Sequence, residues 1–472
     1  MKKPRVLFII SIQFVVRVII RTGFLNRIAK YVEPVLVLDW EDKELMDEIK
    51  SMDIEVHEFP KVRYSASHRH IKNKIDYVWN KKYQKSFSIS LDERIDNKLY
   101  PKSLGKSVLG FIMRLYWITR YSFKKQYEKL LEDENNYFFK NEKVIKIENE
   151  FSNLNIDAVF SQTPYIIYDE VILRLAKKHN IPICAAYLSF DNTTAYGRVP
   201  VIFNSYLLWN KYNKKEIMSS YPESISKSIE IIGAPQFDFY FDNSYLWSEK
   251  VWREKLELPI DRPVILFAAG YFKIVPNEHN WLEQLDNAIT DNKIIGNPII
   301  LFRIHPVDPI DRWESVLKNS KNVVFDVPWE VENPEKGKSN VKRKDIEKLV
   351  STLNYCQVHI NASSSMTIDG AIFDKPQIGP AYDDSPGEKY DKIVKDLYKR
   401  NHFNQIMKSG GLELANSIGE LIYLINLAFE KPSRLKNERK EMVKKVITYD
   451  NGKASFKMEK AFKNFLSQNN LA

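Results

Sequence analysis

The sequence predicts an α/β protein with two domains, each built on a parallel β-sheet that is covered by helices. Three observations support this fold class. The chain has 472 residues, which is too long for a single hydrophobic core. Short apolar runs alternate with helical segments, and this alternation is typical of βαβ units. The alternation starts again after the segment LPIDRP, so we place the two domains at residues 1–250 and 251–472.

The first strand lies close to the N-terminus. The stretch MKKPRVLFIISIQFVVRVII has a basic start and an apolar run, as a signal peptide has, but Arg17 interrupts the run and no small-residue cleavage site follows. The run is also shorter than the roughly 18 to 20 apolar residues of a membrane span. We therefore predict a buried strand over residues 6–10, followed by a loop and a helix.

The remaining strands of the first domain follow in order. We expect them in VEPVLVLDW, IEVHEF, IDAVF, IPICAAYL and SYLLWN. The helical segments KELMDEIKSM and DEVILRLAKKHN lie between some of these strands. The stretch from about residue 61 to residue 150 breaks the alternation, because it is long, helical in pattern and rich in Lys, Arg and aromatic residues. We predict that it is a helical insertion in the first domain.

The second domain repeats the alternation. Its strands are expected in PVILFAAG, NPIILFRIHP, NVVFDVPW and CQVHIN, with a helix in DIEKLVSTLN. From about residue 391 the pattern is helical to the end, which predicts a helical C-terminus. The two halves are therefore expected to form two Rossmann-like domains.

Charge and cysteine content limit the classes of function. The formal net charge is +10, from 71 basic and 61 acidic side chains. This favours an anionic partner such as a nucleotide, an anionic lipid surface or an acidic glycan, although a lysine-rich proteome explains it equally well. Only Cys184 and Cys356 are present, which excludes a disulfide framework and a cysteine zinc site. We expect reduced thiols in the core of a cytoplasmic protein.

Three consecutive serines stand where a strand ends and a helix begins, in NYCQVHINASSSMTIDGAIFDKPQIG. A helix N-terminus offers unpaired N–H groups and a partial positive charge, and Ser363, Ser364 and Ser365 add hydroxyl donors. Together they predict a phosphate-binding loop without glycine. Thr367 joins this donor-binding set, and Asp369, one turn further on, could reach a ribose or sugar hydroxyl. The alternative is that one serine is only an N-cap.

Two further strand ends carry polar or small residues. Arg303 and His305 flank the end of a buried strand on the same side, because strand side chains alternate with a period of two. A guanidinium group can hold a phosphate with two parallel hydrogen bonds, and an imidazole can donate a hydrogen bond or a proton. Gly270 ends another strand, where the backbone could approach a ligand closely. The alternative is a histidine that only caps its strand.

Taken together, GAPQFD, RIHP and ASSSMTIDGAIFDKPQIG resemble motifs of the GT-B glycosyltransferases. The resemblance is strongest to bacterial enzymes that build capsules, lipopolysaccharide and related surface glycans, including polysialyl-, Kdo- and CDP-glycerol-type transferases. It implies two Rossmann-like domains that face each other across a cleft. It also implies that the donor nucleotide diphosphate and ribose are held by Arg303, His305, Ser364, Ser365 and Asp369.

The catalytic base is less well defined. Sialyl-type enzymes carry an acidic pair beside glycine in the first domain, and no such triplet is present here. Asp191, in LSFDNTTAYG, follows a strand and is the first candidate, together with His305 in the second domain. Asp169, His68 and His70 are alternatives. A carboxylate in a loop is, however, usually only solvated.

The resemblance favours a metal-independent glycosyltransferase that moves a sugar from a nucleotide-sugar donor to a cell-surface glycan. The donor would be a substrate, so we expect no separate cofactor, no metal site and no nucleic-acid partner. A CDP-glycerol-type polyol-phosphate transferase is an alternative. A nucleotide-sugar 2-epimerase is less favoured, because SSSM and FDKP stand where that family has a Gly-Gly pair and a Thr-Glu-Arg-Pro stretch. A glycan- or membrane-binding module without activity is disfavoured by the complete set of phosphate-site residues.

The acceptor is expected to be a glycan or a lipid-linked glycan, bound by the first domain. We predict a cytoplasmic enzyme, with peripheral contact to the inner face of the membrane left open. Such a contact would use a basic and aromatic stripe in the insertion. The alternative is that the insertion covers the first domain's own core. The stripe comprises Arg114, Tyr116, Trp117, Arg120, Tyr121, Phe123, Lys124 and Lys125.

Overall fold

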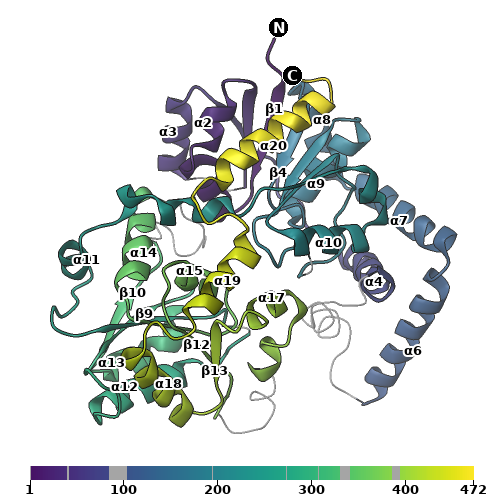
Figure 1. The fold of residues 1–472 in the computed structure, drawn as a ribbon. Helices are drawn as coiled ribbons and strands as arrows, with labels where there is room; N and C mark the ends of the chain where they lie inside the picture. Colours follow the sequence, from purple (N-terminus) through teal and green to yellow (C-terminus); the bar gives the residue numbers. More distant parts are fainter. Residues whose placement is uncertain are drawn as a thin grey trace. The chain divides into compact units, whose positions relative to one another are not determined.

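The computed structural model of the chain describes residues 2–39, 42–83, 104–193, 195–272, 274–306, 308–329, 341–384 and 394–472. These residues form two compact units (Figure 1). The first comprises Met1–Ala234 and Ala454–Ala472, and the second comprises Pro235–Lys453. Each unit is built on a parallel sheet, so the predicted fold class of two α/β domains is confirmed.

The first unit contains a seven-stranded sheet in the order β3-β2-β1-β4-β5-β6-β7, and every pair of neighbours is parallel. All five residues of β1 after Arg5 are buried, as expected for a central strand with both faces covered. The strands are β1 (Arg5–Ile10), β2 (Glu33–Leu38), β3 (Glu55–His57), β4 (Ala158–Ser161), β5 (Ile183–Ala186), β6 (Ser205–Leu208) and β7 (Ser228–Ile231).

Polar N-cap residues start several helices of the first unit. The Asp42 carboxylate accepts the Leu45 N–H at 2.9 Å, and the Asn210 amide oxygen accepts the N–H groups of Tyr212 and Asn213. The helices are α1 (Gln13–Val16), the π-helix η1 (Arg17–Arg21), α2 (Phe24–Ile28), α3 (Lys43–Ser51), α4 (Ala66–Tyr83), α6 (Leu104–Tyr121), α7 (Lys124–Phe139), α8 (Glu142–Asn153), α9 (Ile167–Lys178), α10 (Lys211–Ser220) and the 3-10 helix η2 (Pro222–Ser226). Helices α4, α6, α7 and α8 form the predicted helical insertion.

The last helix, α20 (Ala454–Gln468), returns to the first unit. In Figure 1 it is drawn in yellow and crosses the first sheet near β1 and β4. The ring of Phe462 lies 5.9 Å from that of Phe8, 6.2 Å from that of Phe24 and 5.4 Å from that of Phe160. The compact units therefore divide differently from the domains drawn from sequence, which assigned the whole tail to the second domain and placed the boundary at residue 250.

The second unit contains a six-stranded parallel sheet in the order β10-β9-β8-β11-β12-β13. Strand β8 lies between β9 and β11, so the ends of these three strands are neighbours. This places three of the predicted polar loops at one edge of the sheet. The strands are β8 (Val264–Ala268), β9 (Ile299–Arg303), β10 (Val323–Asp326), β11 (Val358–Asn361), β12 (Gln377–Pro380) and β13 (Leu412–Ala415).

Helix α12 follows strand β8 and helix α15 follows strand β11. The helices of the second unit are of two kinds. They are the 3-10 helices η3 (Pro235–Phe241), η4 (Asn243–Tyr245), η5 (Ile310–Trp313) and η7 (Asn401–Phe403), and the α-helices α11 (Glu249–Lys255), α12 (His279–Thr290), α13 (Glu314–Asn319), α14 (Arg343–Tyr355), α15 (Met366–Ile372), α17 (Asn404–Met407), α18 (Ile418–Glu430) and α19 (Lys436–Ile447).

Two predictions about the chain's general character can be compared with the structure. The N-terminal apolar run begins with the buried strand β1, and none of the helices among the described residues is long and apolar enough to span a membrane. Cys184 and Cys356 are both buried free thiols. Burial raises the pKa of each thiol, so neither is activated as a nucleophile.

Candidate functional site

The loops after β8, β9 and β11 meet at the carboxyl edge of the second sheet. They carry Gly270, His305 and the three serines. A Cβ placed on Gly270 would lie 3.8 Å from the carbonyl oxygen of Ala362, the residue before the serines. The structure therefore brings together the strand ends that the sequence singled out, at the edge where open parallel sheets bind ligands.

Gly270 uses its backbone to hold a protein carboxylate. Its N–H lies 3.0 Å from each carboxylate oxygen of Glu278. A Cβ at this position would approach Val275 Cγ2 to 2.8 Å, which is too close for any residue larger than glycine. The sequence predicted that the Gly270 backbone approaches a ligand, and in the structure its N–H group contacts Glu278.

A buried charge cluster surrounds Glu278. Arg312 Nη2 lies 3.4 Å from Glu278 Oε1, and Arg312 Nε lies 3.4 Å from Asp308 Oδ2. The same Asp308 oxygen accepts the indole N–H of Trp313 at 2.9 Å. Burial raises the pKa of Glu278 to about 8, and the Gly270 N–H and Arg312 only partly oppose this effect. Sequence reasoning did not find this cluster, because its members lie in irregular connections and at helix ends.

His305 lies beside this cluster. Burial and the positive charge of Arg312 lower its pKa to about 4. The imidazole is therefore neutral near pH 7, with one nitrogen able to accept a proton and the other able to donate a hydrogen bond. Its ring centroid lies 5.7 Å from that of Tyr271, in the loop after β8.

Arg303 has its partners inside the protein. Its side chain is almost fully buried and forms an ion pair with Asp326 at the end of β10. Its Nη2 donates to the carbonyl oxygen of Pro328 at 3.2 Å, and Lys348 also contacts Asp326, at 2.8 Å. The two residues predicted to act together are thus separated in role, since Arg303 joins β9 to β10 while His305 faces Arg312.

The three serines also differ from one another. Ser363 has a positive φ of 45°, and its hydroxyl donates to the carbonyl oxygen of Leu397 at 3.2 Å. The hydroxyl of Ser364 accepts the N–H of Met366 at 3.2 Å, as a capping side chain does. Ser365 is exposed and makes no side-chain capping bond at the start of α15. Ser363 therefore fixes the loop, Ser364 caps the start of α15, and Ser365 is the exposed one of the three.

The two residues further along α15 are buried. The hydroxyl of Thr367 donates to Asn361 Oδ1 at 2.8 Å. Asp369 is 5% exposed and accepts a hydrogen bond from the hydroxyl of Tyr240, in η3. In this structure Asp369 thus links α15 to the segment GAPQFDFYF. The Asn361 Nδ2 group is buried and has no hydrogen-bond partner among the described residues, so this strand end retains an unused donor.

The candidate bases of the first unit occupy different environments. Asp191 is half-buried after β5 and accepts a hydrogen bond from Asn192 Nδ2 at 3.3 Å. Asp169 is fully buried and accepts hydrogen bonds from Ser161 and Thr163, so it does not reach solvent. His68 is buried against Glu134, at 2.6 Å.

His70, on α4, is exposed, and its ring centroid lies 5.6 Å from that of Trp117. Burial and the charge of Lys74 lower its pKa. As for metal binding, the described part of the chain contains no group of three His, Cys, Asp or Glu side chains that could hold a metal ion.

The match to a family model shows the family. Residues 201–462, more than half of the chain, match the family described as CDP-Glycerol:Poly(glycerophosphate) glycerophosphotransferase. The chain belongs to this family. The match includes the loops after β8, β9 and β11, and hence His305, Arg312 and the serines. No match was found among curated proteins.

Solved structures show the same fold at low sequence identity. S. aureus MnaA bound to UDP gives a TM-score of 0.56 at 10% identity, covering 99% of this chain and 97% of that chain. The UDP-GlcNAc 2-epimerase from Neisseria meningitidis bound to UDP-GlcNAc gives 0.54 at 11% identity, covering 98% and 100%. A glycosyltransferase from Rickettsia africae gives 0.52 at 12% identity, covering 99% of both chains. At these identities the likeness shows the fold alone.

Membership of the glycerophosphotransferase family changes the order of the functional alternatives. A transferase of the cell-surface polymer type that acts on a nucleotide-linked donor agrees with the match. Transfer of a polyol phosphate, which the sequence left as an alternative, fits the family better than transfer of a sugar.

Proposed function

We propose that this chain transfers glycerol phosphate, or a related polyol phosphate, from a CDP-linked donor to a growing cell-surface polymer. The observation that carries this proposal is the family match over residues 201–462. In this reaction an acceptor hydroxyl oxygen forms a bond to the phosphorus of the polyol phosphate. The bond from that phosphorus to the oxygen of CMP breaks, CMP leaves with the electron pair, and a base takes the hydroxyl proton.

The carboxyl edge of the second sheet supplies the groups that would hold the donor diphosphate. Arg312 is a cation beside the neutral His305, Ser364 and Ser365 supply hydroxyl donors, and Ser365 adds its backbone N–H group. We assign the phosphate-binding charge to Arg312 because its carboxylate contacts, to Glu278 and Asp308, are both 3.4 Å long and its side chain is 15% exposed, whereas the 7% exposed Arg303 forms a closer ion pair with Asp326. Donors that are fixed before the reaction stabilise charge on a departing phosphate without reorganisation.

Two groups are proposed for proton transfer. His305 is neutral near pH 7 and can accept the proton or hold the transferred phosphate. Of the two carboxylates that the sequence proposed as the base, Asp191 in the first unit is the one that is partly exposed. Asp169 is too deeply buried to meet an acceptor hydroxyl, so we do not propose it as the base.

A direct experiment tests the proposed reaction. Purified protein is incubated with a polyol-phosphate acceptor and CDP-glycerol, and CMP release is measured. UDP-GlcNAc and CMP-sialic acid serve as sugar donors for comparison. Polyol-phosphate transfer predicts that CMP appears from CDP-glycerol and that the acceptor grows by one unit per CMP. Turnover of a nucleotide sugar without turnover of CDP-glycerol would contradict the proposal.

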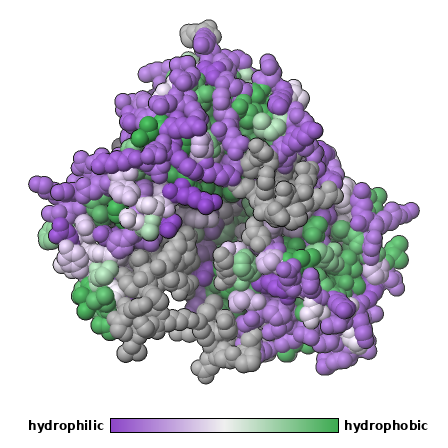
Figure 2. Space-filling view, turned by 180° about the vertical axis from the view of Figure 1, so that it is seen from behind, coloured by the Kyte–Doolittle hydropathy of each residue, from purple (hydrophilic) through white to green (hydrophobic). Residues whose placement is uncertain are grey.

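We also propose that α6 binds an anionic membrane surface. Its residues Val108, Phe111, Ile112 and Leu115 follow helical spacing and are each more than half exposed, at 54% to 61%. Trp117, on the other face, is buried. Figure 2 shows hydrophobic side chains at the lower left of the turned view, where α6 lies. The neighbouring basic residues are Arg114, Arg120, Lys124 and Lys125.

An uncovered apolar face beside basic residues suits the interface of an anionic bilayer. Co-sedimentation with vesicles that contain phosphatidylglycerol should capture the wild-type protein at low salt. The double change Phe111→Ser and Leu115→Ser should reduce this capture, whereas Ile145→Ser, at an exposed apolar residue on α8, should not. Equal capture of all three proteins would contradict the membrane role of α6.

A further inference from the structure

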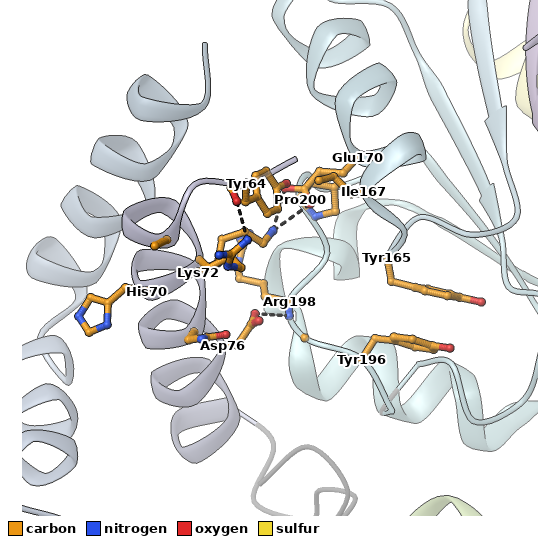
Figure 3. Close-up of a pocket in the computed structure, with 14 residues that line it drawn as sticks. Tyr64, His70, Lys72, Asp76, Tyr165, Ile167, Glu170, Tyr196, Arg198 and Pro200 are labelled. Carbon is orange, nitrogen blue, oxygen red and sulfur yellow. Dashed lines mark hydrogen bonds and ion pairs between the residues drawn. The ribbon is translucent and has the colours of Figure 1, made fainter. Parts of the chain in front are cut away.

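The first unit contains a pocket of about 660 Å³ that lies on its insertion side (Figure 3). One wall is α4. The other walls are the loop from β4 into α9 and the loop between β5 and β6, which follow the carboxyl ends of two neighbouring parallel strands. The lining residues are Tyr64, Ala66, Arg69, His70, Lys72, Asn73, Asp76, Tyr165, Ile167, Glu170, Tyr196, Gly197, Arg198 and Pro200.

The buried charges under this pocket neutralise one another. Lys72 Nζ lies 2.8 and 2.9 Å from the two carboxylate oxygens of Glu170, and Arg174 lies 2.7 Å from Glu170 and 2.8 Å from Glu134. Burial raises the pKa of Glu170, but the charges of Lys72 and Arg174 outweigh it and lower the pKa to about 2. Two cations thus balance two carboxylates.

A glycine allows the opposite wall to lie against α4. Asp76 Oδ1 accepts the backbone N–H of Arg198 at 2.9 Å. A Cβ on Gly197 would lie 2.4 Å from the Asp76 carboxyl group, so only glycine permits this approach. Arg198 is thereby held at the pocket, where its guanidinium donates to the carbonyl oxygen of Val199 at 3.1 Å and lies 3.8 Å from a Glu223 carboxylate oxygen.

The remaining lining has one positive charge in excess and several groups for hydroxyls. Arg69 and Arg198 contribute two positive charges, and Asp76 contributes one negative charge. Asn73 adds an amide. The rings of Tyr165 and Tyr196 are stacked, with centroids 3.9 Å apart and planes at 12°, and Figure 3 shows them side by side at one end of the lining. Such a surface can hold one anion together with neighbouring hydroxyl groups.

We infer that this pocket binds one phosphodiester unit of a polyol-phosphate chain, the acceptor of the transfer reaction. A phosphodiester carries a single negative charge, which equals the excess positive charge of the lining. Its polyol carries hydroxyls that can meet Asn73, Asp76 and the tyrosine rings. The inference rests on the proposed function for the identity of the polymer, and the pocket lies entirely within the first unit.

Calorimetric titration without any donor tests the inference. The probe is a short poly(glycerol phosphate) oligomer, and glycerol serves as the uncharged comparison. Arg69→Gln and Arg198→Gln should each weaken oligomer binding about tenfold, because each removes a charge-assisted hydrogen bond. Lys146→Gln, at an exposed lysine on α8, is the matched control and should bind as the wild type does. Binding should also weaken as salt rises.

The possible outcomes test the proposed binding site separately from the proposed reaction. Weaker oligomer binding by both arginine variants, with unchanged CMP binding by the same samples, supports the pocket. Unchanged oligomer affinity in both variants, or equal affinity of the wild type for glycerol and the oligomer, overturns it. Oligomer binding that depends on the arginines in a protein that fails to turn over CDP-glycerol would retain the pocket and reject the proposed function. Loss of vesicle binding in the arginine variants without loss of oligomer binding would assign the phosphodiester to a lipid headgroup and overturn the polymer assignment.

Discussion

At the carboxyl edge of the second sheet, His305, Ser364 and Ser365 remain at least partly exposed. At the same edge of the first sheet, the polar groups at the ends of β1 and β4 are buried. Ser11 follows β1, Ser161 ends β4, and both are fully buried together with Asp169. Ser11 contacts Thr163 at 2.7 Å, and Thr163 and Ser161 both bond to Asp169.

Both edges contain a buried carboxyl group whose pKa is raised by burial, to about 7 for Asp169 and about 8 for Glu278. Their partners differ, because Asp169 is held by hydroxyls while Glu278 is held by a backbone N–H and Arg312. The comparison teaches that parallel topology places polar groups at an edge but does not make them available. Availability depends on whether their hydrogen-bonding capacity is already used inside the protein.

The largest expected effect concerns Arg303. Arg303→Leu should lower the free energy of unfolding by about 3 to 5 kcal/mol, because it leaves the buried Asp326 without its main partner. Urea unfolding measures this cost. The double change of Arg303→Leu with Asp326→Leu should recover part of it, since both members of the pair are then removed. If the Arg303→Leu protein is as stable as the wild type but has lost affinity for the donor, Arg303 binds the donor phosphate and its role is not structural.

The next effect concerns His305, the partly exposed residue that follows the same strand. His305→Ala should reduce turnover of CDP-glycerol about a hundredfold or more, on the order of 3 kcal/mol in transition-state free energy. Its unfolding curve should stay close to that of the wild type. His57→Ala changes an imidazole on the edge strand β3 that pairs with Glu55 and should leave turnover unchanged. Near-normal turnover by the folded His305→Ala protein would show that His305 does not take part in the reaction.

A smaller effect on stability, visible only as a pH dependence, is expected from Asp169, which is buried at the edge of the first sheet. Burial raises the pKa of Asp169 from 3.8 to about 7, so between these values the folded state holds a proton that the unfolded state has lost. This contribution to stability is complete below about pH 4 and is lost as pH rises through 7.

Wild-type protein should therefore lose about 2 kcal/mol of stability between pH 5 and pH 7 relative to Asp169→Asn. Urea unfolding of both proteins at the two pH values gives the difference directly. The asparagine variant keeps the size of the side chain and cannot titrate. Parallel pH profiles for the two proteins would show that Asp169 is ionised at pH 5 in the folded state.

The smallest effect distinguishes the serines. Ser365→Ala should weaken nucleotide binding by about 1 kcal/mol, the value of one hydrogen bond. Ser363→Ala should act on the loop, because its hydroxyl bonds to Leu397, and it should lower the melting temperature more than Ser365→Ala does. Calorimetry and thermal unfolding on the same samples separate the two effects. Equal behaviour of the two variants in both measurements would contradict the different roles.

The alternation of apolar runs and helices was sufficient to predict the two parallel sheets, because buried parallel strands read as continuous apolar segments. It also located the strand ends at Gly270, His305 and the serines. The partners of these residues could not be predicted. Arg303 pairs with Asp326 because β10 lies beside β9, and strand order is not visible in a single sequence. Arg312 and Glu278 lie in connections that have no periodic pattern.

The choice between sugar and polyol-phosphate transfer was beyond the reach of composition and spacing, since both reactions need the same phosphate-binding chemistry. The return of α20 to the first unit was also not visible, because an amphipathic helix shows that it has a buried face but not which sheet covers that face.

The return of α20 has a consequence for the order of events during synthesis. Domains generally fold in the order in which they leave the ribosome, from the N-terminal end. Here the rings of Phe8, Phe24 and Phe160 are made early, but their partner Phe462 emerges only after residues 235–453 have been translated. Part of the hydrophobic core of the first unit therefore stays solvent-exposed until the second unit has been translated. Interrupted synthesis should leave this surface accessible to chaperones and proteases.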